Sequence, residues 1–248
     1  QRTLAVIERH DLHPSQPLFG KSAGKFTAAE LGRVVRRDPR MLGAAEPLIK
    51  ALDADQLAAV IDGWCDSLVQ HPTWGFPLLG KVAEPQRRLQ AWERWSTAAR
   101  NADGVIALAT VQLLPEDLRE REARRHLHEV IALGTRPTER LQYARFLPWD
   151  EAAGALRAFL GFPDGGVRGL ALATMLAIPG LRPGETALVE KALAMVTARK
   201  NEQDPVRMTM LQALVGWPRE VWRVEHVPTI HRILRDALDA RDLSHRDR

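Results

Sequence analysis

One stretch of the chain, residues 163–179, recurs closer to the C-terminal end as residues 203–218. In both copies an Asp-containing turn precedes a Val-Arg pair, an apolar segment of helical length follows, and a proline ends it. Asp164 and Asp204 stand where N-caps are expected, because carboxylates accept hydrogen bonds from the free N–H groups of a first helical turn. The prolines at 179 and 218 prevent each helix from continuing. The recurrence predicts a chain built from repeated helical units.

Four prolines mark these units over a longer part of the chain. Helices are expected to end just before Pro115, Pro148, Pro179 and Pro218, so that successive stops are 33, 31 and 39 residues apart. Apolar residues at helical spacing predict a second helix in each unit. These second helices are expected at residues 116–133, 150–160, 185–198 and 229–240. A period of this size with two helices per unit is typical of helical solenoids.

The turns resemble those of the HEAT and armadillo class of helical repeats. Residues 204–207, Asp-Pro-Val-Arg, are similar to that family's Asp-Pro-x-Val-Arg turn but one residue shorter, and residues 163–168 form a looser copy. The resemblance covers residues 104–240 and implies an all-α, right-handed α-solenoid of stacked antiparallel helix pairs. It also implies that the side chains of the two turns form a ladder that fixes the stacking. The residues given this structural role are Asp164, Arg168, Asp204 and Arg207.

The chain is expected to divide into three parts. Residues 1–103 form an irregular helical start of the array, residues 104–240 carry the regular repeats, and residues 241–248 form a polar tail. In the first part, Thr27 with Glu30 and Asp53 with Gln56 have the spacing of capping boxes. Residues 71–84 form a long loop with several aromatic and leucine side chains, which predicts that it packs against the helices.

Composition favours an all-α protein and limits the classes of function. Strand-like alternation is almost absent. The net charge of +4 comes mostly from arginines with acidic residues interleaved, which predicts a solvated mixture of charges instead of a basic stripe. The single cysteine, Cys65, excludes an internal disulfide framework and favours a reducing cytoplasm. The bias toward Arg, Ala and Leu suggests a bacterial genome of high GC content, and no apolar run approaches the length of a membrane span.

The motif-like segments predict no catalytic residue, no cofactor and no metal site. Residues 20–24 match the Gly-x-Ser-x-Gly spacing of a hydrolase nucleophile, but no strand precedes them, as that motif requires. A phosphate-binding loop is excluded at the same place because its first glycine is missing. His126 and His128 are two residues apart and so point from different faces of a helix. His126 also follows Glu122 by one turn, which predicts a surface pair.

The tryptophans and a cluster of arginines are the remaining candidates for function. Trp64, Trp92 and Trp95 lie within apolar helical patterns and are expected in the core. Three others lie at or just beyond proline stops, where they either staple successive helices or form an aromatic binding surface. The densest basic cluster is interleaved with acids, so it is either a self-neutralised helix surface or a contact for a partner. The candidate partner-binding residues are Trp149, Trp217, Trp222, Arg121 and Arg125.

Two main functions follow from this pattern. The leading hypothesis is a non-enzymatic scaffold that binds a protein partner in its concave groove. Because residue 1 is Gln instead of Met, the hypothesis includes fused domains of a larger protein. The alternative is nucleic-acid binding, because HEAT-like repeats include DNA glycosylases for alkylated bases, which place Trp and Asp at a concave site. Trp149 and Asp150 are the only adjacent pair of that kind here. An enzyme of another type is a third, weaker hypothesis.

Overall fold

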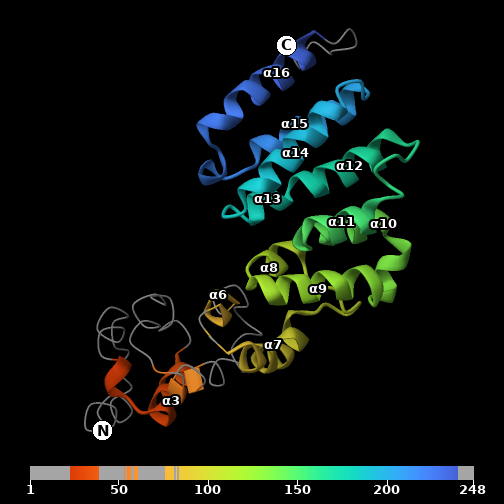
Figure 1. Ribbon diagram of the computed structural model, residues 1–248. Helices are drawn as coiled ribbons and strands as arrows, with labels where there is room; N and C mark the ends of the chain where they lie inside the picture. The colour runs from red at the N-terminus through yellow and green to blue at the C-terminus, as the bar shows by residue number, and fades with distance from the viewer. Residues whose placement is uncertain are drawn as a thin grey trace. The chain divides into compact units, whose positions relative to one another are not determined.

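The computed structural model of the chain describes residues 23–38, 53, 55–56, 59–60, 76–80, 82 and 84–239 (Figure 1). Every regular element in these ranges is helical, which confirms the all-α prediction. The chain divides into an N-terminal unit, Gln1–Leu118, and a C-terminal unit, Arg119–Arg248, and each is considered by itself. The polar tail at 241–248 lies outside the described residues, and the predicted boundary after residue 103 stays a prediction.

Local capping explains where helices begin in the N-terminal unit. A short 3-10 helix, η1 (Ala23–Lys25), precedes α3 (Ala28–Arg37). The backbone N–H of Thr27 donates to Glu30 Oε2 at 2.9 Å, and the N–H of Glu30 donates back to the Thr27 hydroxyl at 3.4 Å. Asp53 and Gln56 make the equivalent reciprocal bonds at 3.0 and 2.8 Å. Both capping-box predictions are therefore confirmed.

Aromatic packing forms the core of the same unit. Its other described helices are α6 (Phe76–Leu79), α7 (Pro85–Ala99) and α8 (Leu108–Gln112). Phe76 meets Trp92 edge-on with ring centroids 5.5 Å apart, and lies 6.5 Å from Trp95. All three side chains are buried, so the two tryptophans belong to the core and Phe76 packs down, as predicted. The expectation of a loop over residues 71–84 is wrong for residues 76–79, which form α6. Trp64, Cys65 and most of residues 20–24 lie outside the described residues.

The C-terminal unit is a succession of short and medium helices. Helix α9 (Glu116–His128) crosses the boundary between the units and leads into η3 (Ile131–Thr135), α10 (Pro137–Leu141) and η4 (Gln142–Phe146). The chain continues through α11 (Trp149–Leu156), α12 (Gly165–Leu176), α13 (Ile178–Leu181) and α14 (Thr186–Ala198). It ends in α15 (Asp204–Val215), η5 (Arg219–Val221), η6 (Val224–His226) and α16 (Val227–Leu238).

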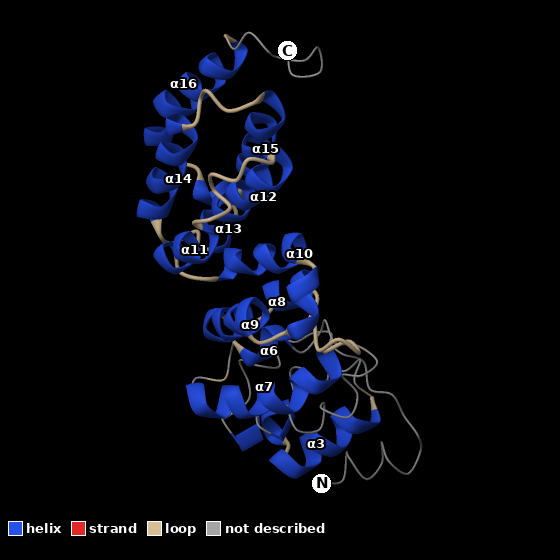
Figure 2. Ribbon diagram, turned by 90° about the vertical axis from the view of Figure 1, so that its right-hand side faces the viewer, coloured by secondary structure: helices blue, strands red, loops and turns tan. Residues whose placement is uncertain are grey.

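The two recurring segments pack on one another as equivalent helices. Helix α12 packs against α15, and α14 packs against α16. Figure 2 shows α11, α14 and α16 on one side of this unit and α10, α12 and α15 on the other. The two helices meet where Gly169 of α12 faces Thr209 of α15, and a Cβ at Gly169 would make an ordinary contact with the Thr209 hydroxyl at 3.5 Å. The two recurring segments are therefore neighbours in the fold, and α14 and α16 are a second pair of neighbours.

One hydrophobic core holds these layers together. Leu172 and Leu176 of α12 lie fully buried in it, and Met210 of α15 is almost as deeply buried. The same core includes further residues from α14, α15, α16 and the segment after α15: Val189, Ala192, Leu193, Val196, Val206, Leu214, Trp217, Val221 and Ile233. Burial of each large aliphatic side chain contributes about 1.5–3 kcal/mol before entropy is counted.

Some predicted helices are shorter in the structure. The helix expected at 116–133 ends at His128, because Val130 adopts an extended backbone and the chain resumes as the 3-10 helix η3. The N–H groups of Glu129 and Val130 both donate to the carbonyl of Arg125 there. The helix expected at 150–160 ends at Leu156 and passes into turns. The stops before Pro115, Pro148 and Pro218 agree with helix or 3-10 ends at residues 112, 146 and 215. Helix α12 ends at residue 176, but Pro179 itself lies in the first turn of the next helix, α13.

Candidate functional site

The arginine of the Val-Arg pair makes one bond of the same kind in both recurring turns. Arg168 and Arg207 are each the fourth residue of their helix, α12 and α15. Arg168 Nη1 donates to the carbonyl of Pro163, five residues earlier, at 3.1 Å, and also to that of Phe162. Arg207 Nη1 donates to the carbonyl of Glu202, likewise five residues earlier. Both arginines fold back over the turn that precedes their helix, so the sequence recurrence is also a recurrence of geometry.

A single glutamate joins the two turns. Glu202 accepts a hydrogen bond from Arg168 Nε at 2.9 Å through one carboxylate oxygen and from Arg199 at 3.1 Å through the other. The side chains of Arg168 and Glu202 are only 12% and 15% exposed, so water screens this pair weakly. Charge-assisted bonds of this kind are roughly twice as strong as neutral ones. The Arg168–Glu202 pair therefore ties the turn of α12 to the turn of α15.

The two aspartates act within their own turns. Asp164 is the N-cap of α12 and accepts from the backbone N–H of Val167 at 2.9 Å, as predicted. Asp204 is instead the first residue of α15, after Gln203 as N-cap, so the N-cap prediction for Asp204 is wrong. Its carboxylate pairs with Arg207 at 3.1 Å. The bond between turns belongs to Glu202, which the motif did not single out.

The three tryptophans beside proline stops pack against the same core. Trp217 is 6% exposed, and its indole N–H donates to the carbonyl of Leu176 at the end of α12. Trp222 is partly buried with its ring centroid 4.8 Å from that of Trp217, and Trp149 is partly buried against the same core. Burial makes Trp217 a staple between successive helices and removes it from any exposed binding surface. Trp149 and Trp222 keep part of their surface exposed.

The basic cluster of α9 is largely neutralised by its neighbours. Arg125 pairs with Glu122 at 2.7 Å. Arg124 pairs with Glu151 of α11 at 2.7 Å and with a glutamate one turn earlier, and these bonds raise its pKa. The hydrogen bonds from Arg124 also lower the pKa of the Glu151 carboxyl. Arg121 is exposed. Arg124 and Arg125 are therefore each engaged by a glutamate of the same unit.

The predicted surface pair of Glu122 and His126 is buried. His126 is 0% exposed and Glu122 is 2% exposed, which corrects the surface assignment. His126 Nδ1 lies 2.7 Å from the carbonyl of Glu122, and its ring stacks on Tyr143 with centroids 4.1 Å apart. Burial raises the pKa of the Tyr143 hydroxyl to about 12, with the charge of Glu139 adding to the effect. The spacing predicted the contact between Glu122 and His126. Their burial depends on Tyr143 from η4, which covers that face of α9.

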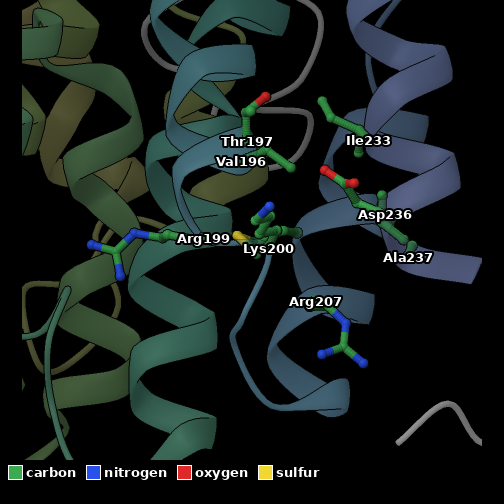
Figure 3. A pocket seen from close by; sticks show the side chains of 10 residues that line it. Val196, Thr197, Arg199, Lys200, Arg207, Ile233, Asp236 and Ala237 are labelled. Atoms are coloured by element: carbon green, nitrogen blue, oxygen red, sulfur yellow. The ribbon is translucent and has the colours of Figure 1, made fainter. Parts of the chain in front are cut away.

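A hollow lies between α14, α15 and α16 (Figure 3). The space within it, counted out into open solvent, is about 320 Å³. The walls are almost wholly apolar, with Val196 at the end of α14, Met210 and Leu211 on α15, and Ile233 and Ala237 on α16. Because that space includes open solvent, the hollow is a partly open depression and not an enclosed binding pocket.

Charged groups surround this apolar hollow. Arg199, Lys200, Arg207 and Asp236 complete its lining. In Figure 3 the guanidinium groups of Arg199 and Arg207 extend away from the centre, whereas the carboxylate of Asp236 points toward it. Arg199 and Arg207 already pair with Glu202 and with an aspartate of the turn. Among the described residues, neither Lys200 nor Asp236 makes an ion pair or hydrogen bond, so their opposite charges are available to a ligand.

Other classes of site find little support in the described part of the chain. No group of three or more His, Cys, Asp and Glu side chains in these ranges could hold a metal ion. Among the same residues, none of the helices is both long and apolar enough to cross a membrane. No family model, no curated protein and no solved structure matches the chain.

Proposed function

We propose that the C-terminal unit is a right-handed, HEAT-like α-solenoid that acts as a non-enzymatic scaffold and binds a segment of a protein partner. The observation that carries the proposal is the repeated stacking of α12 on α15 and α14 on α16, with the same arginine geometry in both turns. Stacked helix pairs of this kind produce extended surfaces, which repeat proteins use to bind other proteins. The scaffold works in the cytoplasm, either with a separate partner or with fused domains of a larger chain.

The charge arrangement favours a protein ligand over a nucleic acid. Nucleic-acid binding depends on several basic side chains that neutralise phosphates together. Here Arg124, Arg125 and Arg168 are each engaged by a glutamate at 2.7–2.9 Å, so contacting phosphates would require breaking existing pairs. The hollow beside α16 has apolar walls, and its lining combines three basic side chains with one carboxylate, a mixture that suits a protein segment with both charges.

Direct competition between the two ligand classes tests the proposal. The full chain is immobilised and exposed to displayed random linear peptides, and its binding to a labelled mixed-sequence DNA duplex is measured by fluorescence anisotropy at increasing salt. We expect specific peptides to be retained and duplex binding to be weak and lost near physiological salt, because few phosphates are neutralised at once. Submicromolar duplex binding with a steep salt dependence, and no retained peptide, would reverse the assignment toward the glycosylase-like alternative.

A further inference from the structure

We infer that His226 is an acid-sensitive switch: while its ring is neutral it holds the start of α16 in place, and protonation of the ring releases α16 from the core. The switch is a property of the C-terminal unit that does not depend on the proposed protein-binding function. Two observations support it together. The ring accepts a hydrogen bond from the backbone, and the residue is only 7% exposed, with no carboxylate of the described residues at ion-pair distance.

The hydrogen bond determines the protonation state of the ring. The backbone N–H of Arg223 lies 3.2 Å from His226 Nδ1. A backbone N–H can only donate, so Nδ1 accepts through its lone pair, and the single proton of the neutral ring is then on Nε2. A second proton on Nδ1 would place two hydrogens between the two nitrogens and break the bond. The folded structure therefore requires a neutral His226.

The position of the ring disfavours a positive charge. His226 is the N-cap of α16, where the free N–H groups of the first helical turn carry positive partial charge. The ring of Trp222 lies roughly perpendicular to it with the centroids 6.4 Å apart, beyond the distance of about 6 Å at which an aromatic face attracts a cation. A proton gained here would therefore create a buried cation that its immediate contacts do not stabilise.

The charged groups of the neighbouring elements provide no counter-ion. Those of η5 and η6, of the residue between them and of the body of α14 are exposed: Arg219, Glu220, Arg223, Glu225, Glu190 and Lys191. On α16 itself, His231, Arg232 and Arg235 are exposed as well, and Asp236 is ten residues along the helix, about 15 Å away. Among the described residues, none of these side chains forms an ion pair with the His226 ring. Protonation is therefore not compensated by any element packed at this end of α16.

Loss of this bond affects α16 because η6 runs directly into it. Residues 224–226 form η6, and α16 begins at Val227, packs against α14 and buries Ile233 in the core. The released segment can bind a proton on the ring and the folded segment cannot. The free energy of unfolding is therefore independent of this group above about pH 7 and falls below about pH 6.5, where free histidine gains a proton. Acid loosens α16 in this way and uncovers the side of α14 beneath it.

Replacing the ring by an acceptor that cannot gain a proton tests the switch. In His226→Asn the side-chain carbonyl can accept from the Arg223 N–H but does not titrate. Between about pH 7.5 and pH 5.5, the unfolding equilibrium constant should rise about tenfold more in the wild-type full chain than in H226N, because one proton gives a factor of ten for each pH unit below the value for free histidine. Urea denaturation followed by circular dichroism measures both constants. His231→Asn, at an exposed histidine of α16, is the matched control and should keep the acid dependence of the wild type.

Two measurements on the wild-type chain decide the question even if H226N does not fold. Nitrogen NMR at neutral pH should show His226 Nδ1 without a proton and Nε2 with one. Hydrogen exchange should show the amides of α16 losing protection relative to those of α12 between about pH 7.5 and pH 5.5. Equal acid dependence of the wild type and H226N overturns the switch, as does a proton on Nδ1 at neutral pH or an unchanged relative protection of α16. None of these measurements involves a ligand, so their outcome is separate from that of the peptide-binding experiment.

Discussion

Replacing Arg207 by alanine is expected to destabilise the C-terminal unit by about 1–3 kcal/mol. Arg207 is 7% exposed, so its bonds form in a region that water hardly enters. The substitution removes the ion pair with Asp204, 3.1 Å long, and the bond to the carbonyl of Glu202. A hydrogen bond to a charged group is worth about 1.5–3 kcal/mol, and a partner left buried without it adds a desolvation cost. The expected loss remains near the range for one such bond because Asp204 is 16% exposed and can recover some hydration.

Urea denaturation followed by far-UV circular dichroism measures this loss. In a thermal scan, each kcal/mol corresponds to about 2–4 °C for a chain of this length. Arg232→Ala is the matched control, because Arg232 lies exposed on α16, and a surface substitution of that kind is expected to stay within about 0.5 kcal/mol. If R207A and R232A unfold at the same urea concentration, the structural role of the arginine turn is refuted. If R207A keeps its stability but loses peptide binding, Arg207 belongs to the binding site instead.

Three further measurements test the packing and electrostatics. The chain has one tyrosine, so the tyrosinate absorbance reports on Tyr143 alone; we expect its midpoint near pH 12 in the folded protein and near pH 10 after denaturation. Because folding raises this pKa, the contribution of Tyr143 to the free energy of unfolding is present below pH 10 and is lost as the pH rises toward 12. In Tyr143→Phe, the free energy of unfolding should no longer fall over this pH range. Folding lowers the pKa of Glu151 through Arg124, so its contribution is present above pH 4.5 and is lost as the pH falls further; Glu151→Gln should unfold with a weaker dependence on acid. Leu172→Ala removes a fully buried side chain of the core and should cost about 2–5 kcal/mol in urea denaturation, whereas a loss below about 1 kcal/mol would contradict the core assignment.

The recurring turns could be predicted from the sequence because they depend on local chemistry. Asp164 caps α12 through a backbone N–H three residues away, and both arginines bond carbonyls five or six residues away. The residue that joins the turns could not be predicted in the same way. Glu202 lies 34 residues from Arg168, and only the stacking of α12 on α15 brings them together. In the sequence, Glu202 is visible only as an acidic residue just before the second turn. No pattern there indicates that Arg168 is its partner.

Whether a side chain is buried was harder to predict from the sequence than which residues touch. The spacing of Glu122 and His126 indicates that they touch, but whether they face water depends on which element covers α9, and Tyr143 does so from a separate element. Trp217 shows the same limit, since its position after a helix allowed either a staple or a binding role, and the bond to α12 decides for the staple. The hollow could not be predicted at all, because its walls come from three helices whose apolar residues also look like ordinary core positions.

The segment from residue 199 to residue 207 contributes both to the bond between repeats and to the wall of the hollow, and Glu202→Gln separates these roles. Glutamine keeps an acceptor for Arg168 and Arg199 but loses the charge, so we expect a loss of about 1 kcal/mol in the free energy of unfolding. Since the variant remains almost wholly folded, the affinity for selected peptides should stay within about twofold of the wild type. Calorimetric titration of E202Q alongside urea denaturation measures both quantities on one sample. If peptide affinity falls tenfold while stability is unchanged, Glu202 contacts the ligand directly, and the binding surface includes the turns themselves.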